Sequence, residues 1–305
     1  MNEFTGRNIR MLPETFTPSF LRQIELLRVR SRRTFLGARQ GAHASLRKGH
    51  GIEFSDFRKY ELGDNPRDID WGVYARSDKL FVKRFKEEEN LSVLLIIDGS
   101  SSMTRAPNES KWQSARDLAL ALSYAALMDQ DTITISVPGN YQSPSFSGAK
   151  SIHTIGKQVL ELKVGGNPDM ASQINLAASR IRFPGKAIFL SDFLMPIEVL
   201  EKSFNILRAK NLDITAIQIL SPNDFEPYKG LENATLIDSE TEEIINIALD
   251  SENRAEYSEL LEEHNRKVQD FFSAAQIQYT IFKSDESLLD FIIKNLTLIG
   301  LLKRS

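Results

Sequence analysis

The stretch Leu91-Ser92-Val93-Leu94-Leu95-Ile96-Ile97, followed by Asp98-Gly99-Ser100-Ser101-Ser102-Met103, decides the fold class. Its first seven residues have the length and the branched apolar side chains of a strand buried in a parallel sheet. Asp98, Ser100 and Ser102 therefore follow the carboxyl end of a strand, where open α/β sheets bind their ligands. One carboxylate and two hydroxyls are oxygen ligands that suit a hard divalent cation such as Mg²⁺. The stretch thus predicts an α/β fold with a metal site at one edge of the sheet.

Strands and helices alternate along the chain after this stretch. The predicted elements are a strand over 92–97, a helix over 110–129, a strand over 132–137, helices over 155–162 and 170–182, a strand over 187–190, a helix over 196–209, a strand over 214–220, a helix over 253–274, a strand over 279–282 and a helix over 288–302. Alternation of this kind predicts a doubly wound, mostly parallel sheet with helices on both faces. Residues 235–239 and 244–248 form a predicted β-hairpin insertion.

The first 90 residues follow a different pattern. Thr17 and Pro18 read as the N-cap and first position of a helix that we expect to continue to about Thr34. Short strands are predicted over 52–57 and 80–85. These residues hold too little regular apolar pattern for a core of their own. We therefore expect residues 1–90 to be an extension packed on an α/β domain of residues 91–305.

Composition excludes several classes of protein. The chain of 305 residues is 26% charged and 41% hydrophobic, which is typical of a globular protein. It contains no cysteine, so it has no disulfide framework and no thiolate metal site. The apolar stretch over 288–302 is too short and too charged to span a bilayer, and residues 1–7 lack the apolar core of a signal peptide. We expect a cytoplasmic protein with a buried terminal helix.

The charge is distributed unevenly along the chain. Residues 1–90 carry 18 Lys and Arg against 13 Asp and Glu, a balance of +5, and the remainder carries a balance of −8. The basic residues concentrate between Leu21 and His50 without the interleaved aromatic residues of a nucleic-acid-binding motif. This pattern favours a solvated face or an acidic protein partner over nucleic acid.

Two later loops offer further oxygen ligands. Asn167 follows a Gly-Gly turn before a helix, and Asp192 ends the strand predicted from Ala187. With the Asp-x-Ser-x-Ser pattern of the first loop, the chain resembles the von Willebrand factor A fold and its metal-ion-dependent adhesion site. The resemblance implies Mg²⁺ or Mn²⁺ held by Asp98, Ser100, Ser102 and Asp192, with Asn167 where that family usually has a Thr. The alternative is that the serines cap the next helix and that Asp192 belongs to an ordinary loop.

The segment before the first strand carries a more specific pattern. Gly63-Asp64, Arg67, Ile69-Asp70-Trp71 and Ala75-Arg76 occur in close succession. The pattern resembles the bacterial domain of unknown function 58 family, over roughly residues 35–300. Its abundant opposite charges predict a salt-bridged segment pinned onto the sheet, with Trp71 as an apolar anchor.

That resemblance also implies a partner. Members of the family are commonly encoded beside MoxR-type AAA+ ATPases, which implies an adaptor in chaperone-like assembly. No His-Glu-x-x-His, Gly-x-Ser-x-Gly or phosphate-binding Gly-x-x-x-x-Gly-Lys pattern is present, so we do not expect an enzyme. Two alternatives stay open: a metal-dependent hydrolase that uses the same acidic site, and a scaffold with an inactive metal site.

Overall fold

A computed structural model describes residues 12–31, 52–64, 66–87, 90–104, 111–165, 169–182, 185–225, 233–237, 244–248 and 251–304. The chain divides into two compact units. One comprises residues 1–33 and 91–305, and the other comprises residues 34–90. The prediction that the segment 52–85 packs on the α/β unit stays a prediction.

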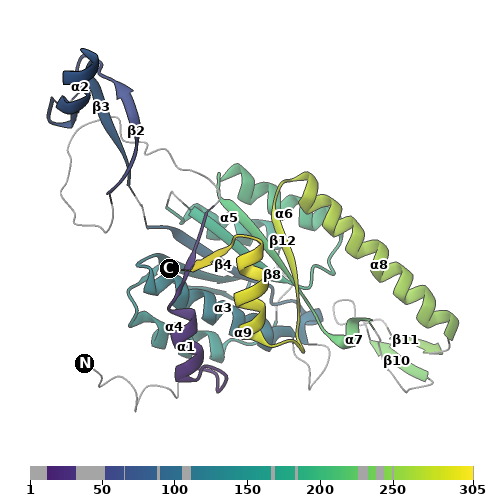
Figure 1. Ribbon diagram of the computed structural model, residues 1–305. Coiled ribbons are helices and arrows are strands. Elements are labelled where there is room, and N and C mark those ends of the chain that lie inside the picture. The colour runs from purple at the N-terminus through teal and green to yellow at the C-terminus, as the bar shows by residue number, and fades with distance from the viewer. Residues whose placement is uncertain are drawn as a thin grey trace. The chain divides into compact units, whose positions relative to one another are not determined.

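A seven-stranded sheet forms the centre of the larger unit (Figure 1). Its strands are β4 (Ser92–Ile97), β5 (Thr132–Val137), β6 (Tyr141–Gln142), β7 (Phe146–Ser147), β8 (Gly185–Ser191), β9 (Asp213–Leu220) and β12 (Gln278–Lys283). The strand order is β12-β9-β8-β4-β5-β6, and β7 also pairs with β5. All pairs are parallel except those of the two short strands β6 and β7 with β5. The predicted mostly parallel sheet is confirmed.

Helices lie along both sides of this sheet. They are α3 (Lys111–Met128), α4 (Ser151–Glu161), α5 (Met170–Ser179), α6 (Ile197–Ala209), the short α7 (Pro222–Phe225) and α8 (Ser251–Ala274). All but α7 coincide with predicted helices to within a few residues, as boundaries usually do.

Alternate residues of β4 enter two separate apolar cores. Val93, Leu95 and Ile97 pack into a core shared with α3 and α4. Leu94 and Ile96 pack into a second core shared with α5, α6 and α8. All five side chains are at most 1% exposed, because a strand covered on both faces has no solvent side.

The order of the strands reverses between β4 and β8. The chain passes from β4 to its neighbour β5 on one side, and then returns to β8 on the other side. The carboxyl ends of β4 and β8 therefore meet at a topological switch point, where the connections leave in opposite directions. The loops after Ile97 and Ser191 start from this point.

The N-terminal helix is shorter than predicted. Thr17 caps α1 (Pro18–Ile24) by accepting a hydrogen bond from the Phe20 N–H at 3.2 Å. The expected continuation to Thr34 is wrong, because Leu27–Val29 form strand β1 instead. This strand pairs with β13 (Leu302–Arg304) at the other end of the chain.

The same pairing shortens the C-terminal helix. We expected one helix over 288–302, but α9 (Leu288–Asp290) continues as a π-helix over Phe291–Leu296 before the chain reaches β13. The expected burial holds for one face of this segment, since Phe291 and Leu296 are at most 1% exposed while Leu298 is 86% exposed.

The smaller unit contains a two-stranded antiparallel ribbon and a short helix. The predicted strands are confirmed as β2 (Ile52–Lys59) and β3 (Phe81–Glu87), and α2 (Trp71–Ser77) was not predicted. Asp70 caps α2, and Arg58 pairs with Asp64 at 2.7 Å. Trp71 is 59% exposed, and its role as an apolar anchor on the sheet stays a prediction, like the packing of this segment. For some charged residues of this segment, the structure describes the backbone but not the side chain.

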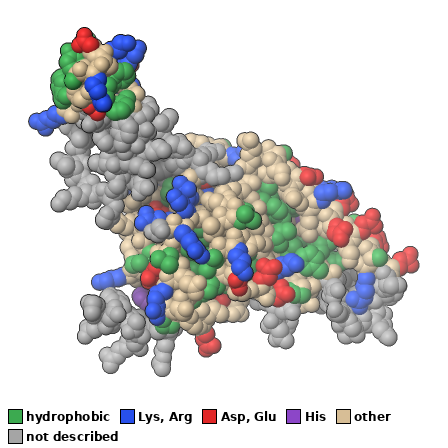
Figure 2. All heavy atoms as spheres, in the orientation of Figure 1, with side chains coloured by type: hydrophobic (Ala, Val, Ile, Leu, Met, Phe, Trp, Pro, Cys, Tyr) green, Lys and Arg blue, Asp and Glu red, His purple; other side chains and the backbone are tan. Residues whose placement is uncertain are grey.

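The predicted hairpin is confirmed as β10 (Asn233–Ile237) and β11 (Ile244–Ala248), which pair antiparallel. It is followed by α8, where acidic side chains gather on the face drawn in Figure 2. Among the described helices, none combines the length and the apolar character that crossing a membrane would require.

Asp131 connects the starts of two central strands. Its Oδ1 accepts a hydrogen bond from the Leu91 N–H at 2.8 Å, while its buried Oδ2 has no hydrogen-bond partner among the described residues. Burial is the main reason that the pKa of this carboxyl rises from 3.8 to about 7, and the nearby charge of Asp129 adds to it.

We therefore expect Asp131→Asn to make the protein more stable above neutral pH. Because the pKa is raised in the folded state, the native protein binds an extra proton between about pH 4 and pH 7, and stability falls as pH rises through that range. One pKa unit corresponds to about 1.4 kcal/mol, so the variant should gain on the order of a few kcal/mol at pH 8 and little at about pH 4. Urea unfolding at both pH values measures the difference, with Glu259→Gln on α8 as control. An equal effect of Asp131→Asn at both pH values would contradict this assignment.

Candidate functional site

Two buried aspartates follow the adjacent strands β4 and β8. Asp98 comes directly after β4, and Asp192 comes directly after β8. Each residue is 1% exposed. The Asp98 N–H donates to the Leu190 carbonyl at 2.8 Å, which extends the pairing of the two strands to their ends. The sheet therefore holds both carboxylates at the switch point.

Asp98 is held by the chain around it. Its Oδ1 accepts a hydrogen bond from the Ser100 N–H at 2.9 Å, and its Oδ2 accepts one from the Ser191 hydroxyl at 2.6 Å. Burial, together with the negative charge of Asp192, raises the pKa of Asp98 to about 6, although these hydrogen bonds oppose the rise. The charge of Asp192 thus disfavours the ionised form of Asp98.

The two serines of the first loop lie side by side. The Ser100 and Ser102 hydroxyl oxygens are 2.9 Å apart, and both residues are half-buried. Ser101–Thr104 form a 3₁₀ turn that brings the second serine back beside the first. Gly99 is required here, because a Cβ at this position would lie 2.8 Å from Val137 Cγ1.

Lys111 supplies a cation to the same place. This first residue of α3 is 2% exposed. Its Nζ donates to Asp192 Oδ2 at 2.7 Å and to Asp224 Oδ1 at 2.9 Å. The second carboxylate is itself fixed, because its Oδ2 accepts hydrogen bonds from the N–H and the hydroxyl of Ser221. We call Lys111, Asp192 and Asp224 the lysine triad.

The second loop is described only in part. The Gly165 N–H donates to the Gly99 carbonyl at 3.2 Å, so this loop reaches the first one. Asn167 lies outside the described residues. Asp169 caps α5. Its carboxylate accepts a hydrogen bond from the Ser172 hydroxyl, and this hydrogen bond lowers the pKa of Asp169.

Sequence reasoning missed Lys111, Asp224 and Ser191. For Lys111, the sequence offered one indication of such a role. A cation near the start of a helix is opposed by the helix dipole by about 0.3–1 kcal/mol, which is a weak indication of an anionic partner. The partner could not be named, because Asp192 and Asp224 are 81 and 113 residues away in the sequence.

The residues present suit a hard divalent cation. Neighbouring ligands of an octahedral Mg²⁺ at about 2.1 Å lie about 3 Å apart, which matches the separation of the Ser100 and Ser102 hydroxyls. Asp98 accepts from the Ser100 N–H, and Asp192 is near enough to Asp98 for its charge to act on it. Within the described part of the chain, no group of three or more His, Cys, Asp or Glu side chains could hold a metal ion. Any cation here would therefore depend on hydroxyls and water as well as carboxylates.

The fold and this cluster define a mixed α/β protein with oxygen-rich loops at the switch point of a mostly parallel sheet. The family described as protein of unknown function DUF58 matches the chain over residues 56–267. The chain belongs to this family.

Named relatives and solved structures give the wider context. The chain is 26% identical over 247 residues to uncharacterized proteins of Mycobacterium bovis, Mb1516, and Mycobacterium tuberculosis, Rv1480, covering 76% of this chain and 74% of each relative. The crystal structure of the conserved hypothetical protein BatB from Bacteroides thetaiotaomicron is similar at 15% identity with a TM-score of 0.42. That match covers 69% of this chain and 99% of that one.

We expect Lys111→Met to destabilise the fold strongly, because it leaves two buried carboxylates without their cation. The loss should be about 3–5 kcal/mol of unfolding free energy, measured by urea denaturation. Adding Asp192→Asn should cost less than the sum of the two single changes, because the uncompensated charge is then removed. Lys294→Met is the control, since its pair with Asp290 is exposed and should matter little. Strict additivity would contradict the triad.

Proposed function

We propose that this protein is a metal-assisted protein-binding adaptor with a fold of the von Willebrand factor A type. The observation that carries the proposal is the pair of adjacent hydroxyls, Ser100 and Ser102, beside two buried carboxylates at the switch point. Hydroxyl ligands neutralise no charge, so a divalent cation bound there would stay strongly electrophilic. Such a cation would suit a carboxylate offered by a protein partner.

The formal charge of the cluster supports a cation. Among the described residues of the cluster, the three carboxylates of Asp98, Asp192 and Asp224 accompany the ammonium of Lys111, which leaves a charge of −2 when all are ionised. A divalent cation would balance this charge. In this proposal Lys111 holds Asp192 in place, and Ser191 and the Ser100 N–H orient Asp98.

The partner that we propose is an AAA+ ATPase of the MoxR type, which the protein would serve in the cytoplasm. The chain has no phosphate-binding Gly-x-x-x-x-Gly-Lys pattern of its own, so a nucleotide-driven step would fall to the partner. An acidic side chain of that partner would then complete the environment of the cation.

A second function is favoured by the lysine triad. If Lys111 already satisfies Asp192, the cluster could serve as a metal-independent structural element of a scaffold. A buried ion pair can fix the arrangement of three loops without binding anything. The two functions differ in how the protein responds to metal.

We expect Mg²⁺ or Mn²⁺ to raise the melting temperature of the wild-type protein. At a hundredfold excess over the dissociation constant, ligand binding contributes about 2.7 kcal/mol, or roughly 5 °C or more for a chain of this size. Ser100→Ala should remove most of the increase because it deletes one hydroxyl ligand. Ser101→Ala is the matched control, from the same turn. An absent response at millimolar metal, in a folded wild-type protein, would favour the scaffold.

Partner binding should depend on the same hydroxyls. We expect the ATPase to be retained by the immobilised full chain in Mg²⁺, and to be lost on adding chelator or in Ser100→Ala. Moderate salt should weaken the complex less, because a metal–carboxylate bond is screened less than a surface ion pair. If replacing Arg30, Arg32 and Arg33 by Glu abolishes binding while chelator has no effect, the basic segment is the docking surface instead.

A further inference from the structure

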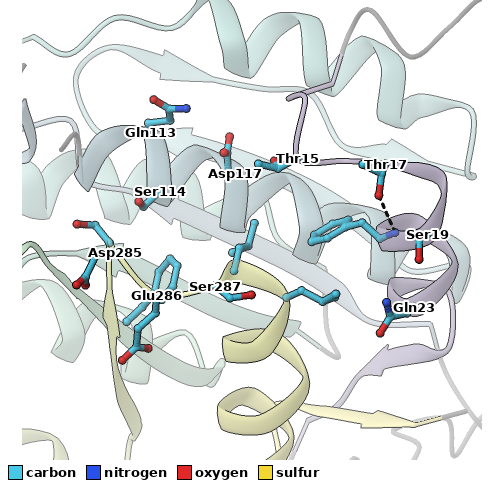
Figure 3. A pocket seen from close by; sticks show the side chains of 15 residues that line it. Thr15, Thr17, Ser19, Gln23, Gln113, Ser114, Asp117, Asp285, Glu286 and Ser287 are labelled. Atoms are coloured by element: carbon cyan, nitrogen blue, oxygen red, sulfur yellow. Dashed lines mark hydrogen bonds between the residues drawn. The ribbon is translucent and has the colours of Figure 1, made fainter. Parts of the chain in front are cut away.

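A pocket of about 770 Å³ opens on the larger unit, lined by residues other than those of the candidate site described above (Figure 3). It lies between the N-terminal segment around α1, the first two turns of α3, and the loop from β12 to α9. Its volume falls in the range of small-molecule sites. No lining residue belongs to the lysine triad or to the Asp98–Ser102 loop.

The lining combines apolar walls with acidic groups. Its apolar side chains are Phe20, Phe282, Leu288 and Leu289. Its charged side chains are Asp117, Asp285 and Glu286, and none of the described residues that line it is a Lys, Arg or His. The remaining lining residues are Ser, Thr and Gln. A pocket of this kind favours a ligand that is cationic at its ends and aliphatic between them.

Asp117 is the buried member of this set. It is only 8% exposed, and among the described residues no donor forms a hydrogen bond with its carboxylate. The neighbouring Arg116 is engaged elsewhere: its Nη1 donates to the Leu160 carbonyl at 3.1 Å, and its guanidinium lies 5.6 Å from the centre of the Trp112 ring. The carboxylate oxygens are not among the buried atoms without a partner, so the pocket leaves this charge open to a cationic ligand.

The electrostatics of Asp117 agree with this geometry. Burial raises its pKa to about 6, and the charge of Arg116 opposes the rise only in part. The two other acidic side chains, Asp285 and Glu286, are exposed. They come from the turn that follows β12, and Figure 3 shows them on the same loop at the side of the pocket opposite α1.

We propose that this pocket binds the primary ammonium group of an aliphatic amine. The ammonium pairs with Asp117 and donates to the neighbouring hydroxyls, while the methylene chain packs against the apolar side chains. A second ammonium on the same chain would reach Asp285 and Glu286 at the mouth. The ligand class is therefore an aliphatic diamine or polyamine, or the lysine side chain of a protein, which offers the same group.

The experiment is calorimetric titration of the full chain with spermidine, with 1,5-diaminopentane and with a blocked lysine peptide. Saturable binding of one equivalent is expected for at least one of these probes, and 1,5-pentanediol should not bind. Preference for the free amines over the peptide would identify a small-molecule site, and the reverse preference would identify a protein ligand. Absence of saturable binding by every amine at millimolar concentration would overturn the proposal.

Asp117→Asn tests the assignment of the ammonium, because it keeps the shape of the side chain and removes its charge. We expect affinity to fall about tenfold or more, as loss of a charge-assisted hydrogen bond predicts. Asp285→Asn with Glu286→Gln changes only exposed residues, and it should weaken the diamine more than 1-aminopentane. Asp270→Asn on α8 is the control. Amine binding that Asp117→Asn and the rim variant leave unchanged would show general attraction to an acidic surface, and would also overturn the proposal.

Discussion

The burial of two like charges at the ends of adjacent strands is the constraint on which the site depends. Asp98 and Asp192 are each 1% exposed, and the charge of the second raises the pKa of the first. Removing a carboxylate from water costs several kcal/mol unless hydrogen bonds or a cation compensate it. The fold supplies both: Ser191 and the Ser100 N–H hydrogen-bond to Asp98, and Lys111 pairs with Asp192. The start of α3 and the turn at Ser221 are therefore fixed by electrostatics as well as by packing.

The sequence predicted most of the parallel sheet, because each central strand carries its signal locally. Five consecutive apolar residues in β4 leave no solvent face, and the alternating elements after it permit few topologies. The errors lie where the deciding contact is distant. The helix predicted up to Thr34 ends at Ile24, since Leu27–Val29 pair with the last strand of the chain. Apolar residues of this kind fit a helix or a strand, and the partner decides between them.

The residues of the candidate site also fall into two groups: those that a local sequence pattern identifies and those that only the fold brings together. Asp98, Ser100 and Ser102 were identified because three functional groups follow one strand within five residues. Lys111 and Asp224 have no such local pattern, and only the fold brings them to Asp192. Asp117 is harder still, because within a helix it resembles any solvent-facing carboxylate. It lines the pocket together with residues around α1 and in the loop after β12, which come from opposite ends of the chain.

Helix α3 carries a key residue of each site. Lys111 and Asp117 are six residues apart, which is about 9 Å along the axis and about 120° around it. The helix can therefore direct its ammonium to the ends of β8 and α7 while its carboxylate lines the pocket beside α1. Most of the remaining residues of this helix are buried, so the helix has little freedom to rotate or shift. The other buried residues of the helix therefore hold both charged side chains in fixed positions. A binding group that is held in this way is preorganised.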